Sequence, residues 1–471
     1  MDSIFQFLTW LDGVFWGYFA FVLVMILGLS LSIRARGYQL RSLPSSVQIF
    51  FQSAKPIESE RGVHPLKVFF ASVGGMIGIG NIVGIVTAIQ IGGPGALFWV
   101  WVAAIIGTII KYSEIFLGLK YRVSNERGSF DGGPMYFLQK AFKNRWIPVL
   151  IAVLLCIYGV EIYQFAVITD SLSVNFNLNR YFIIAGLLFL VYYAGIGGVK
   201  RIGGICCNIM PIFMVVYLSM SIWIIVQEIA ILPAILKNVM ISAFTGHAAV
   251  GGFVGSSAIL GIQHGISRAV YSADIGIGYD SIIQSESSTK EPTKQAKLAI
   301  LGVFIDNLVC TMSILVVLLT GVWSVTEPIE ASRLVQEALS RYFPFMHIFM
   351  PLFLFIVGYT TMIAYFCVGI KCARFLSPQY GVSIYLVYGV FAWVLFSFVD
   401  QTKALLMMSI AGALLLMINL TGIYTLRKEI DYPVGKGLDS PVPPCYRNRV
   451  NSLYFPSSGF PATGGPNLFT P

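Results

Sequence analysis

Long apolar runs dominate this sequence, and each is nearly free of charged side chains. Runs of roughly 18 or more apolar residues are long enough to cross the hydrocarbon core of a bilayer. Of the 471 residues, 56% are hydrophobic and only 11% are charged, far below the roughly 25% charged residues of soluble proteins. A soluble core could not bury this much apolar surface, so we expect an all-α integral membrane protein.

The apolar runs predict eleven transmembrane spans. The first follows an acidic start and lacks a small-residue cleavage site, so we interpret it as a retained helix and not as a signal peptide. Two further segments, 230–243 and 327–342, carry apolar residues at helical spacing and predict helices at the membrane surface. The expected spans cover residues 11–33, 66–90, 95–119, 147–170, 181–199, 202–227, 247–275, 298–321, 345–370, 382–399 and 404–425.

Lysine and arginine are distributed unevenly between the expected loops. If the N-terminus lies outside, the inside loops hold 24 of the 31 basic residues and the outside loops hold five. Because cytoplasmic loops are enriched in Lys and Arg, this predicts a multi-pass protein of the bacterial inner membrane, with its N-terminus outside and its C-terminus in the cytoplasm. The same bias accounts for the net charge of +9, so no nucleic-acid partner is needed.

No motif for catalysis or for a metal cofactor can be assembled from the sequence. The seven cysteines and four histidines show no metal-ligand spacing, and no P-loop or H-E-x-x-H pattern occurs. We therefore expect no enzyme, no cofactor and no identifiable protein partner.

Two of the expected spans contain clusters of glycine, and they lie five spans apart. This spacing divides the chain into an extra N-terminal helix and cytoplasmic loop (1–65), a first repeat (66–227), an external connector (228–246), a second repeat (247–425) and a disordered cytoplasmic tail (426–471). Because five is odd, the two repeats must be inverted. The glycines are Gly74, Gly75, Gly78, Gly80 and Gly84 in the first cluster and Gly251, Gly252, Gly255, Gly261 and Gly265 in the second.

These glycines allow two interpretations. A helix that unwinds inside a membrane frees N–H and C=O groups that only a ligand, an ion, water or a facing helix can satisfy. The N–H groups around Gly78, Gly80 and Asn81 would then suit a carboxylate, and carbonyls near Gly261 and Gly265 would suit an amino group, with 251–255 as the second choice for that break. G-x-x-x-G pairs alone more often mark close helix packing. Matching clusters in inverted repeats favour two broken helices.

One long string makes the sequence similar to a known family. Residues 78–101 read GIGNIVGIVTAIQIGGPGALFWVW, and YR follows at 121–122 and GGPMY at 132–136. These motifs resemble the alanine or glycine:cation symporter family, also described as sodium:alanine/glycine symporters. The resemblance implies a leucine-transporter-like fold with one extra helix in front. It also implies that Gln164 contacts the substrate, and that Thr360 and Thr361 complete a sodium site with carbonyls of the first broken helix.

The sequence departs from the family pattern at several polar positions. Ile79 stands where the family has threonine, Ala166 replaces an asparagine, and 271–276 reads YSADIG in place of F-S-N-E-A-G. Each change removes a polar group or alters an acid, so both sodium and proton coupling stay open.

Ionisable groups inside the expected spans are candidate functional sites because they are expensive to bury. Glu161 lies one turn from Gln164 and is either a proton-coupling carboxylate or, as we favour, a hydrogen-bonded acid between helices. Arg268 and Asp274, at the expected inner end of the seventh span, either latch an inside gate or extend to the interface. Asp306 either joins that gate or, as we favour, supports the unwound helix. Lys111 and Glu114, three residues apart in the third span, are interpreted as a self-neutralising pair.

The sequence therefore predicts a secondary active transporter that imports a small neutral amino acid, alanine or glycine, together with sodium. A proton-coupled carrier or exchanger is the alternative within the same class. An ion channel or a non-transporting membrane sensor is the alternative of another class.

Overall fold

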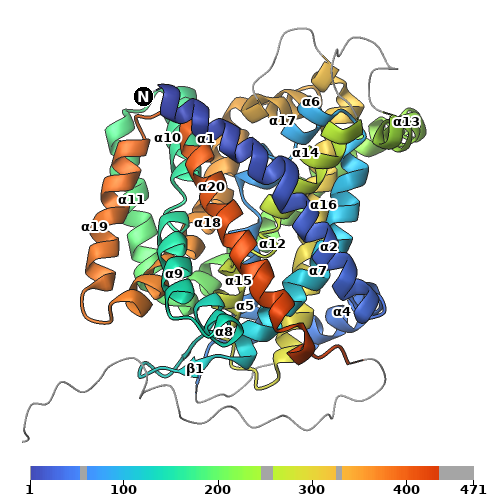
Figure 1. The fold of residues 1–471 in the computed structure, drawn as a ribbon. Helices are drawn as coiled ribbons and strands as arrows, with labels where there is room; N and C mark the ends of the chain where they lie inside the picture. The colour runs from blue at the N-terminus through green and yellow to red at the C-terminus, as the bar shows by residue number, and fades with distance from the viewer. Residues whose placement is uncertain (1, 54–60, 246–257, 325–330, 434–471) are drawn as a thin grey trace, which may run out of the picture. The chain divides into compact units, whose positions relative to one another are not determined.

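Helices and short turns make up almost all of the structure, a computed structural model that describes residues 2–53, 61–245, 258–324 and 331–433 (Figure 1). The described residues belong to one unit, Met1–Gly435. The exceptions to the helices are two short antiparallel strands, β1 (Val123–Ser124) and β2 (Phe130–Asp131). The glycines 251–255 and most of the predicted tail lie outside the described residues.

Seven helices in the described part of the chain are long and apolar enough to cross a membrane, and they confirm seven of the expected spans. Two other expected spans are shorter apolar helices, α11 (Arg180–Ile196) and α19 (Gly381–Phe396), and two are interrupted. The protein is thus a multi-pass membrane protein, while the count of eleven spans and the inverted repeat stay predictions. The seven helices are Phe5–Arg34, Ala96–Lys120, Trp146–Phe176, Gly198–Gln227, Pro292–Thr320, Met346–Leu376 and Gln401–Thr425.

The N-terminal helix is continuous but changes its winding part-way. It consists of α1 (Asp2–Val14), the π-helical turn η1 (Phe15–Ala20) and α2 (Phe21–Arg34). The short helices α3 (Tyr38–Arg41) and α4 (Leu43–Gln52) follow it. A π-helical turn inside an α-helix is rare and frequently marks a functional site.

The second expected span is broken where its glycines predicted. Helix α5 (Pro65–Met76) begins at the N-cap His64, whose Nδ1 accepts a hydrogen bond from the Leu66 amide. The chain then continues through the single 3-10 turn η2 (Ile79–Asn81) and resumes as α6 (Thr87–Gly92). The predicted first broken helix is therefore present, with its break between Met76 and Thr87.

The seventh expected span is also broken, but not at Gly261 and Gly265. Helix α14 (Ala258–Ser272) runs unbroken through both glycines, and the break follows it, before α15 (Tyr279–Gln284). A Cβ atom at position 261 would lie 3.1 Å from the Gly92 carbonyl oxygen, and one at position 265 would lie 2.6 Å from the Ala96 carbonyl oxygen. These two glycines therefore allow close packing of α14 against α6 and the start of the next helix, and the predicted break at Gly261 and Gly265 is wrong. The second choice, 251–255, lies outside the described residues.

The fourth expected span contains an interruption that the sequence did not predict. Helix α9 (Trp146–Tyr158) stops before Glu161, which adopts a left-handed backbone conformation with φ of 50°, and α10 (Ile162–Phe176) begins after it. The indole of Trp393 donates a hydrogen bond to the Val160 carbonyl freed by this interruption.

The remaining helices surround these breaks. Helices α7 and α18 are the most enclosed of the seven long helices, with 83% and 89% of their most apolar segments buried. Helices α13 and α17, both expected at the outer surface, lie at the end of the bundle where α1 begins, whereas α4, α8 and β1 lie at the opposite end (Figure 1). These elements are α7 (Ala96–Lys120), α8 (Pro134–Phe142), α12 (Gly198–Gln227), α13 (Leu232–Thr245), α16 (Pro292–Thr320), η4 (Val322–Ser324), α17 (Ala331–Ser340), α18 (Met346–Leu376), α20 (Gln401–Thr425) and η5 (Arg427–Glu429).

Candidate functional site

A central cavity lies where the two breaks, the α9–α10 junction and α18 meet. Its volume is about 30 Å³, which is room for about two water molecules. The cavity is lined by four polar side chains that the sequence analysis named as candidate site residues: Asn81, Glu161, Gln164 and Asp274. The other lining residues are Gly75, Met76, Gly78, Gly80, Tyr158, Tyr163, Tyr271, Ser272, Thr361 and Tyr365.

The backbone of the first break is held by amide side chains. The Gly78 amide donates to Asn81 Oδ1 at 2.9 Å, and the Ile79 amide donates to Gln164 Oε1 at 3.5 Å. Ser313 on α16 donates to the Asn81 carbonyl at 2.9 Å. Backbone groups freed inside a membrane protein need such partners, so these contacts allow the unwound segment to persist.

Asp306 on α16 connects the first break to the end of α14. Its Oδ1 accepts a hydrogen bond from the Asn81 amide and another, at 3.5 Å, from the Ser272 hydroxyl. Asp306 does not line the central cavity itself. Its geometry fits the supporting role that we favoured from the sequence.

Lys111 on α7 holds the second break. Its ammonium group donates to the carbonyls of Ala273 and Asp274, both at 2.9 Å, and forms an ion pair with Asp280 at 2.9 Å. The expected pairing of Lys111 with Glu114 is therefore wrong, because the lysine uses its donors on a different helix. Both members of the Lys111–Asp280 pair are fully enclosed, with side-chain exposures of 0% and 2%.

Three residues in or at the ends of the second break adopt positive φ angles: Asp274 at 47°, Gly276 at 76° and Gly278 at 104°. Asn419 on α20 donates to the Gly276 carbonyl at 2.9 Å. The left-handed region favours glycine, and the two glycines allow the chain to change direction between α14 and α15.

The two adjacent threonines of α18 have different surroundings. The Thr361 hydroxyl lines the cavity and lies within 3.2 Å of two carbonyl acceptors, that of Gly74 and that of Val357 in its own helix. The Thr360 hydroxyl donates to Val357 of its own helix at 2.8 Å and lies 3.7 Å from the Met210 sulfur. Only Thr361 and a carbonyl of α5 are brought together in the way that the family resemblance implies.

The acids and Arg268 separate into two groups. Glu161 accepts a hydrogen bond from Gln164 at 3.2 Å, and Asp274 lines the same cavity. Arg268 instead lines a different cavity, nearer the start of α1. Helix α14 ends at Ser272, four residues after Arg268, and Asp274 follows in the second break, so the two residues expected in one gate line different cavities.

The family follows from a match that extends over residues 1–433, nearly all of the described chain. The chain belongs to the sodium:alanine symporter family. The alignments of this chain with three relatives cover most of the length of each relative. An uncharacterized transporter of Haemophilus influenzae is 31% identical over 90% of this chain and 94% of its own. The sodium/alanine symporter AgcS of Methanococcus maripaludis is 29% identical over 83% and 86%, and the probable sodium/glutamine symporter GlnT of Bacillus subtilis is 29% identical over 89% and 87%.

A solved structure supports the fold. The manganese transporter of Eremococcus coleocola has a TM-score of 0.51 and 14% sequence identity, covering 76% of this chain and 78% of that one. The family and this likeness make the chain an amino acid transporter with the fold of leucine-transporter-like proteins, and not an enzyme.

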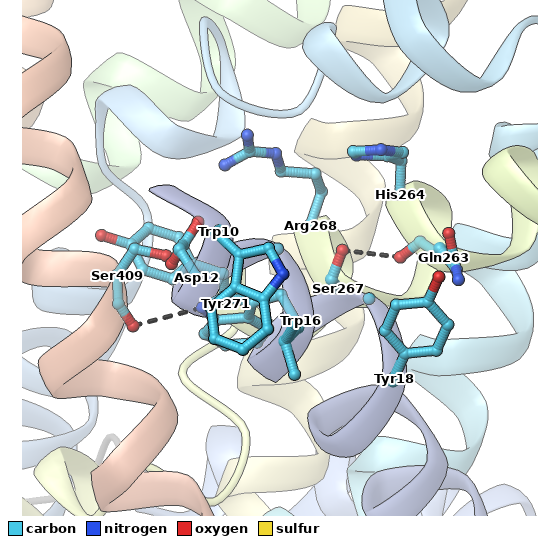
Figure 2. A pocket seen from close by; sticks show the side chains of 13 residues that line it. Trp10, Asp12, Trp16, Tyr18, Gln263, His264, Ser267, Arg268, Tyr271 and Ser409 are labelled. Atoms are coloured by element: carbon cyan, nitrogen blue, oxygen red, sulfur yellow. Dashed lines mark hydrogen bonds between the residues drawn. The ribbon is translucent and has the colours of Figure 1, made fainter. Parts of the chain in front are cut away.

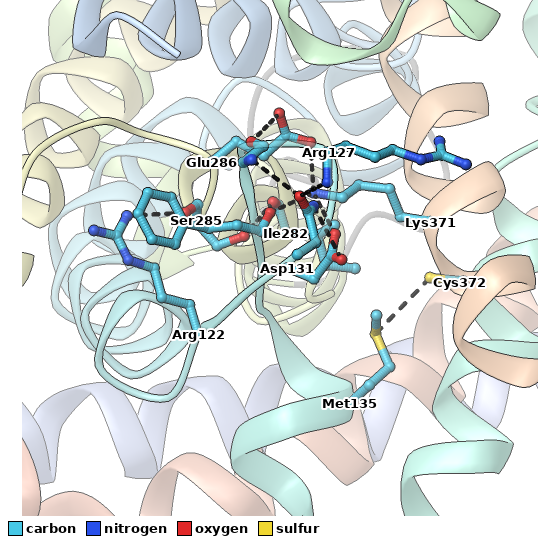
Figure 3. A network of polar contacts seen from close by, with 12 residues as sticks. Arg122, Arg127, Asp131, Met135, Ile282, Ser285, Glu286, Lys371 and Cys372 are labelled. Carbon is cyan, nitrogen blue, oxygen red and sulfur yellow. Dashed lines mark hydrogen bonds and ion pairs between the residues drawn. The ribbon is translucent and has the colours of Figure 1, made fainter. Parts of the chain in front are cut away.

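A polar network joins α18, the β1–β2 hairpin and the segment after α15 (Figure 3), at the end of the bundle where β1 lies (Figure 1). Lys371 on α18 pairs with Glu286 at 2.6 Å and with Asp131 of β2 at 3.3 Å. Arg122 donates to the carbonyls of Ser285 and Ser287 just after α15. The network ties the β1–β2 hairpin to the segment that leaves the second break.

Sequence reasoning missed the pairing of Lys111 with Asp280, which supports the second break. A lysine in the middle of an apolar run is itself a signal, because intramembrane charges are expensive and usually have a partner. The sequence offered Glu114 as a local partner, whereas the observed one lies on α15.

Proposed function

We propose that this chain imports a small neutral amino acid, alanine or glycine, together with sodium across the bacterial inner membrane. The N-terminus is outside and the C-terminus is in the cytoplasm in this proposal. The family supports amino acid transport, and the relative described as a sodium/alanine symporter favours sodium and alanine.

One observation carries the proposal: open space lies beside the unwound backbone of the first break. A Cβ atom at Gly80 would meet nothing within 4 Å, whereas one at Gly78 would lie 2.8 Å from the Thr361 hydroxyl oxygen and 3.1 Å from the Gln164 amide. A carboxylate beside Gly80 would lie next to the unwound backbone and the amide side chains of Asn81 and Gln164 that hold the break.

The amino group of the substrate has acidic partners in the same cavity. Carbonyls near Gly261 and Gly265 are part of a regular helix, so they do not serve as the contact that the sequence suggested. Glu161 and Asp274 line the cavity instead, opposite the first break.

Sodium fits beside the first break. Thr361 and the Gly74 carbonyl supply neutral oxygen atoms, the ligands that hard cations prefer, and carbonyls of an unwound helix serve this role in related folds. A membrane potential contributes about 2.3 kcal/mol per charge per 100 mV, which can drive accumulation without a nucleotide.

Proton coupling through Glu161 is the second candidate. Glu161 is buried, has a left-handed backbone and bonds directly to the expected substrate residue Gln164. A carboxylate in that position could exchange a proton as substrate binds.

Uptake into proteoliposomes, with sodium and proton gradients imposed separately, tests the proposal. Radiolabelled alanine should accumulate under an inward sodium gradient, should saturate and should show counterflow. Accumulation in sodium-free buffer under a proton gradient would instead establish the second candidate. Flux without saturation or counterflow would identify a channel, and binding without flux would identify a sensor.

A further inference from the structure

A second and larger cavity lies between the N-terminal helix, where α1 passes into η1, and α14 (Figure 2). Its volume is about 430 Å³. The N-terminal helix contributes Asp12 and Trp16, α14 contributes His264 and Arg268, and α20 contributes Ser409. The extra helix in front of the repeats thus forms one wall of a polar chamber.

Asp12 and Arg268 face the chamber and attract each other, but they do not form an ion pair within 4 Å in the described part of the chain. The Asp12 Oδ1 atom is buried and has no hydrogen-bond partner in the described part of the chain. Arg268 enters the same chamber but takes part in none of the ion pairs formed among residues 2–53, 61–245, 258–324 and 331–433. A guanidinium group suits a carboxylate, and an aspartate suits an ammonium group, so together they match a zwitterion.

The wall of the chamber is unusual in its backbone. Trp16 lies in the π-helical turn η1, donates a hydrogen bond to the Ser409 carbonyl at 3.2 Å and packs edge-on against Tyr271, with ring centroids 5.9 Å apart. Because π-helical turns frequently occur at functional sites, the winding change and the charge pair are two independent features of one cavity.

Tyr271 lines both the chamber and the central cavity. It is one turn from Arg268 on the same face of α14, since the two are three residues apart. The two cavities therefore share a side chain as a partition.

We propose that the chamber is a second docking site, in which Arg268 binds the carboxylate and Asp12 binds the ammonium group of an amino acid before it passes Tyr271. This site rests on the proposed function for its substrate class and adds a binding step that the central site does not need. It also assigns a ligand-binding role to the N-terminal helix.

Protection of an introduced cysteine tests the site. Gly13 lines the chamber, and a Cβ atom there would meet nothing within 4 Å, so Gly13→Cys should fold. The full chain is purified with Gly13→Cys combined with Gly78→Val, a change that obstructs the central cavity. The rate at which N-ethylmaleimide labels residue 13 is then measured by peptide mass spectrometry. L-alanine at about ten times its dissociation constant should slow labelling roughly tenfold by mass action. Gln164→Ala replaces Gly78→Val as a second background if that variant does not fold.

Charge variants provide the controls. Arg268→Gln and Asp12→Asn should each abolish protection, whereas Lys403→Gln, a cationic position at the start of α20, should preserve it. Protection that is lost in both central-site backgrounds would overturn the docking site. Protection that depends on phosphatidylethanolamine in the bilayer, and not on alanine, would also overturn it, because that headgroup is a zwitterion too. If the wild type takes up alanine but alanine does not protect residue 13, the docking site is overturned and the proposed function stands. If alanine protects residue 13 but the wild type takes up none, the proposed function is overturned and the docking site stands.

Discussion

Single side chains hold the unwound segments, and Lys111 is the clearest example. Replacing it by methionine removes the partner of a buried carboxylate and two carbonyl contacts together. We expect Lys111→Met to lower the free energy of unfolding by about 3–5 kcal/mol, the usual cost of leaving a buried charge unpaired. Denaturant titration in mild detergent measures this change.

Lys120 provides the matched control. Its pair with Glu429 is about one-third exposed, so Lys120→Met should cost no more than about 1 kcal/mol. If both variants lost the same free energy of unfolding, Lys111 would stabilise the protein no more than a surface lysine does, and its proposed role at the second break would be contradicted.

Gly78 brings the first break against Thr361 and Gln164. Gly78→Val should reduce uptake to background while the protein still inserts, because the added side chain enters the cavity. Gly204→Val is the control, since a Cβ atom at position 204 would meet nothing within 4 Å. Proteoliposome uptake measures both variants, and alaninamide should compete poorly with alanine because it lacks the anion. Equal competition by alaninamide would remove the carboxylate from the proposed site.

Thr361 and Thr360 are neighbours with different expected effects on coupling. Thr361→Val removes the hydroxyl that faces Gly74, so the sodium concentration for half-maximal uptake should rise about tenfold, a loss of ~1.4 kcal/mol. Thr360→Val should change it much less, because the contacts of the Thr360 hydroxyl are with Val357 and the Met210 sulfur, and not with Gly74. An unchanged sodium dependence in Thr361→Val, with accumulation lost in Glu161→Gln, would favour proton coupling.

Helices and their breaks show what the sequence could predict. Apolar runs located the long helices, and the glycine-rich run at 66–90 located the first break, because both signals are local. The second break was misplaced because G-x-x-x-G spacing is the same for close packing and for unwinding. Packing and unwinding differ in which group satisfies the backbone carbonyls. At the second break that group is Lys111, which is 162 residues away in the sequence from the Ala273 carbonyl that it binds, so the local pattern could not reveal it.

The second break depends on glycine at its left-handed positions. Gly278 has a φ of 104°, and a Cβ atom there would lie 2.5 Å from Pro134 Cγ. Gly278→Ala should therefore cost at least about 1–2 kcal/mol of stability and should also lower uptake, since it displaces Tyr279 and Asp280. Gly321→Ala carries similar backbone strain without a clash, so uptake should survive there. Comparable uptake by the two variants would contradict a specific role for the second break.

Considered as a whole, the described chain has two unlike ends. The larger cavity lies where α1 passes into η1, and the ion pairs of Lys371 lie at the end of the bundle where β1 lies (Figure 1). The helices expected outside, α13 and α17, share the end of α1 (Figure 1). The start of α1 and both of these helices therefore lie at one end, while the side of the membrane that this end faces stays a prediction.

Topology can be tested with single cysteines at exposed positions of the two ends. Asn177 and Asp400 belong to predicted outside loops, whereas Glu126 and Lys290 belong to predicted inside loops, and all four are exposed. A membrane-impermeant maleimide added to intact cells should label cysteines at 177 and 400 but not at 126 and 290, and permeabilised cells should label all four. Equal exposure in the folded protein makes the membrane the only barrier that separates the pairs. Labelling of Glu126→Cys in intact cells would reverse the orientation, and it would also place the chamber with Asp12 and Arg268 on the cytoplasmic side, where it would serve release and not entry.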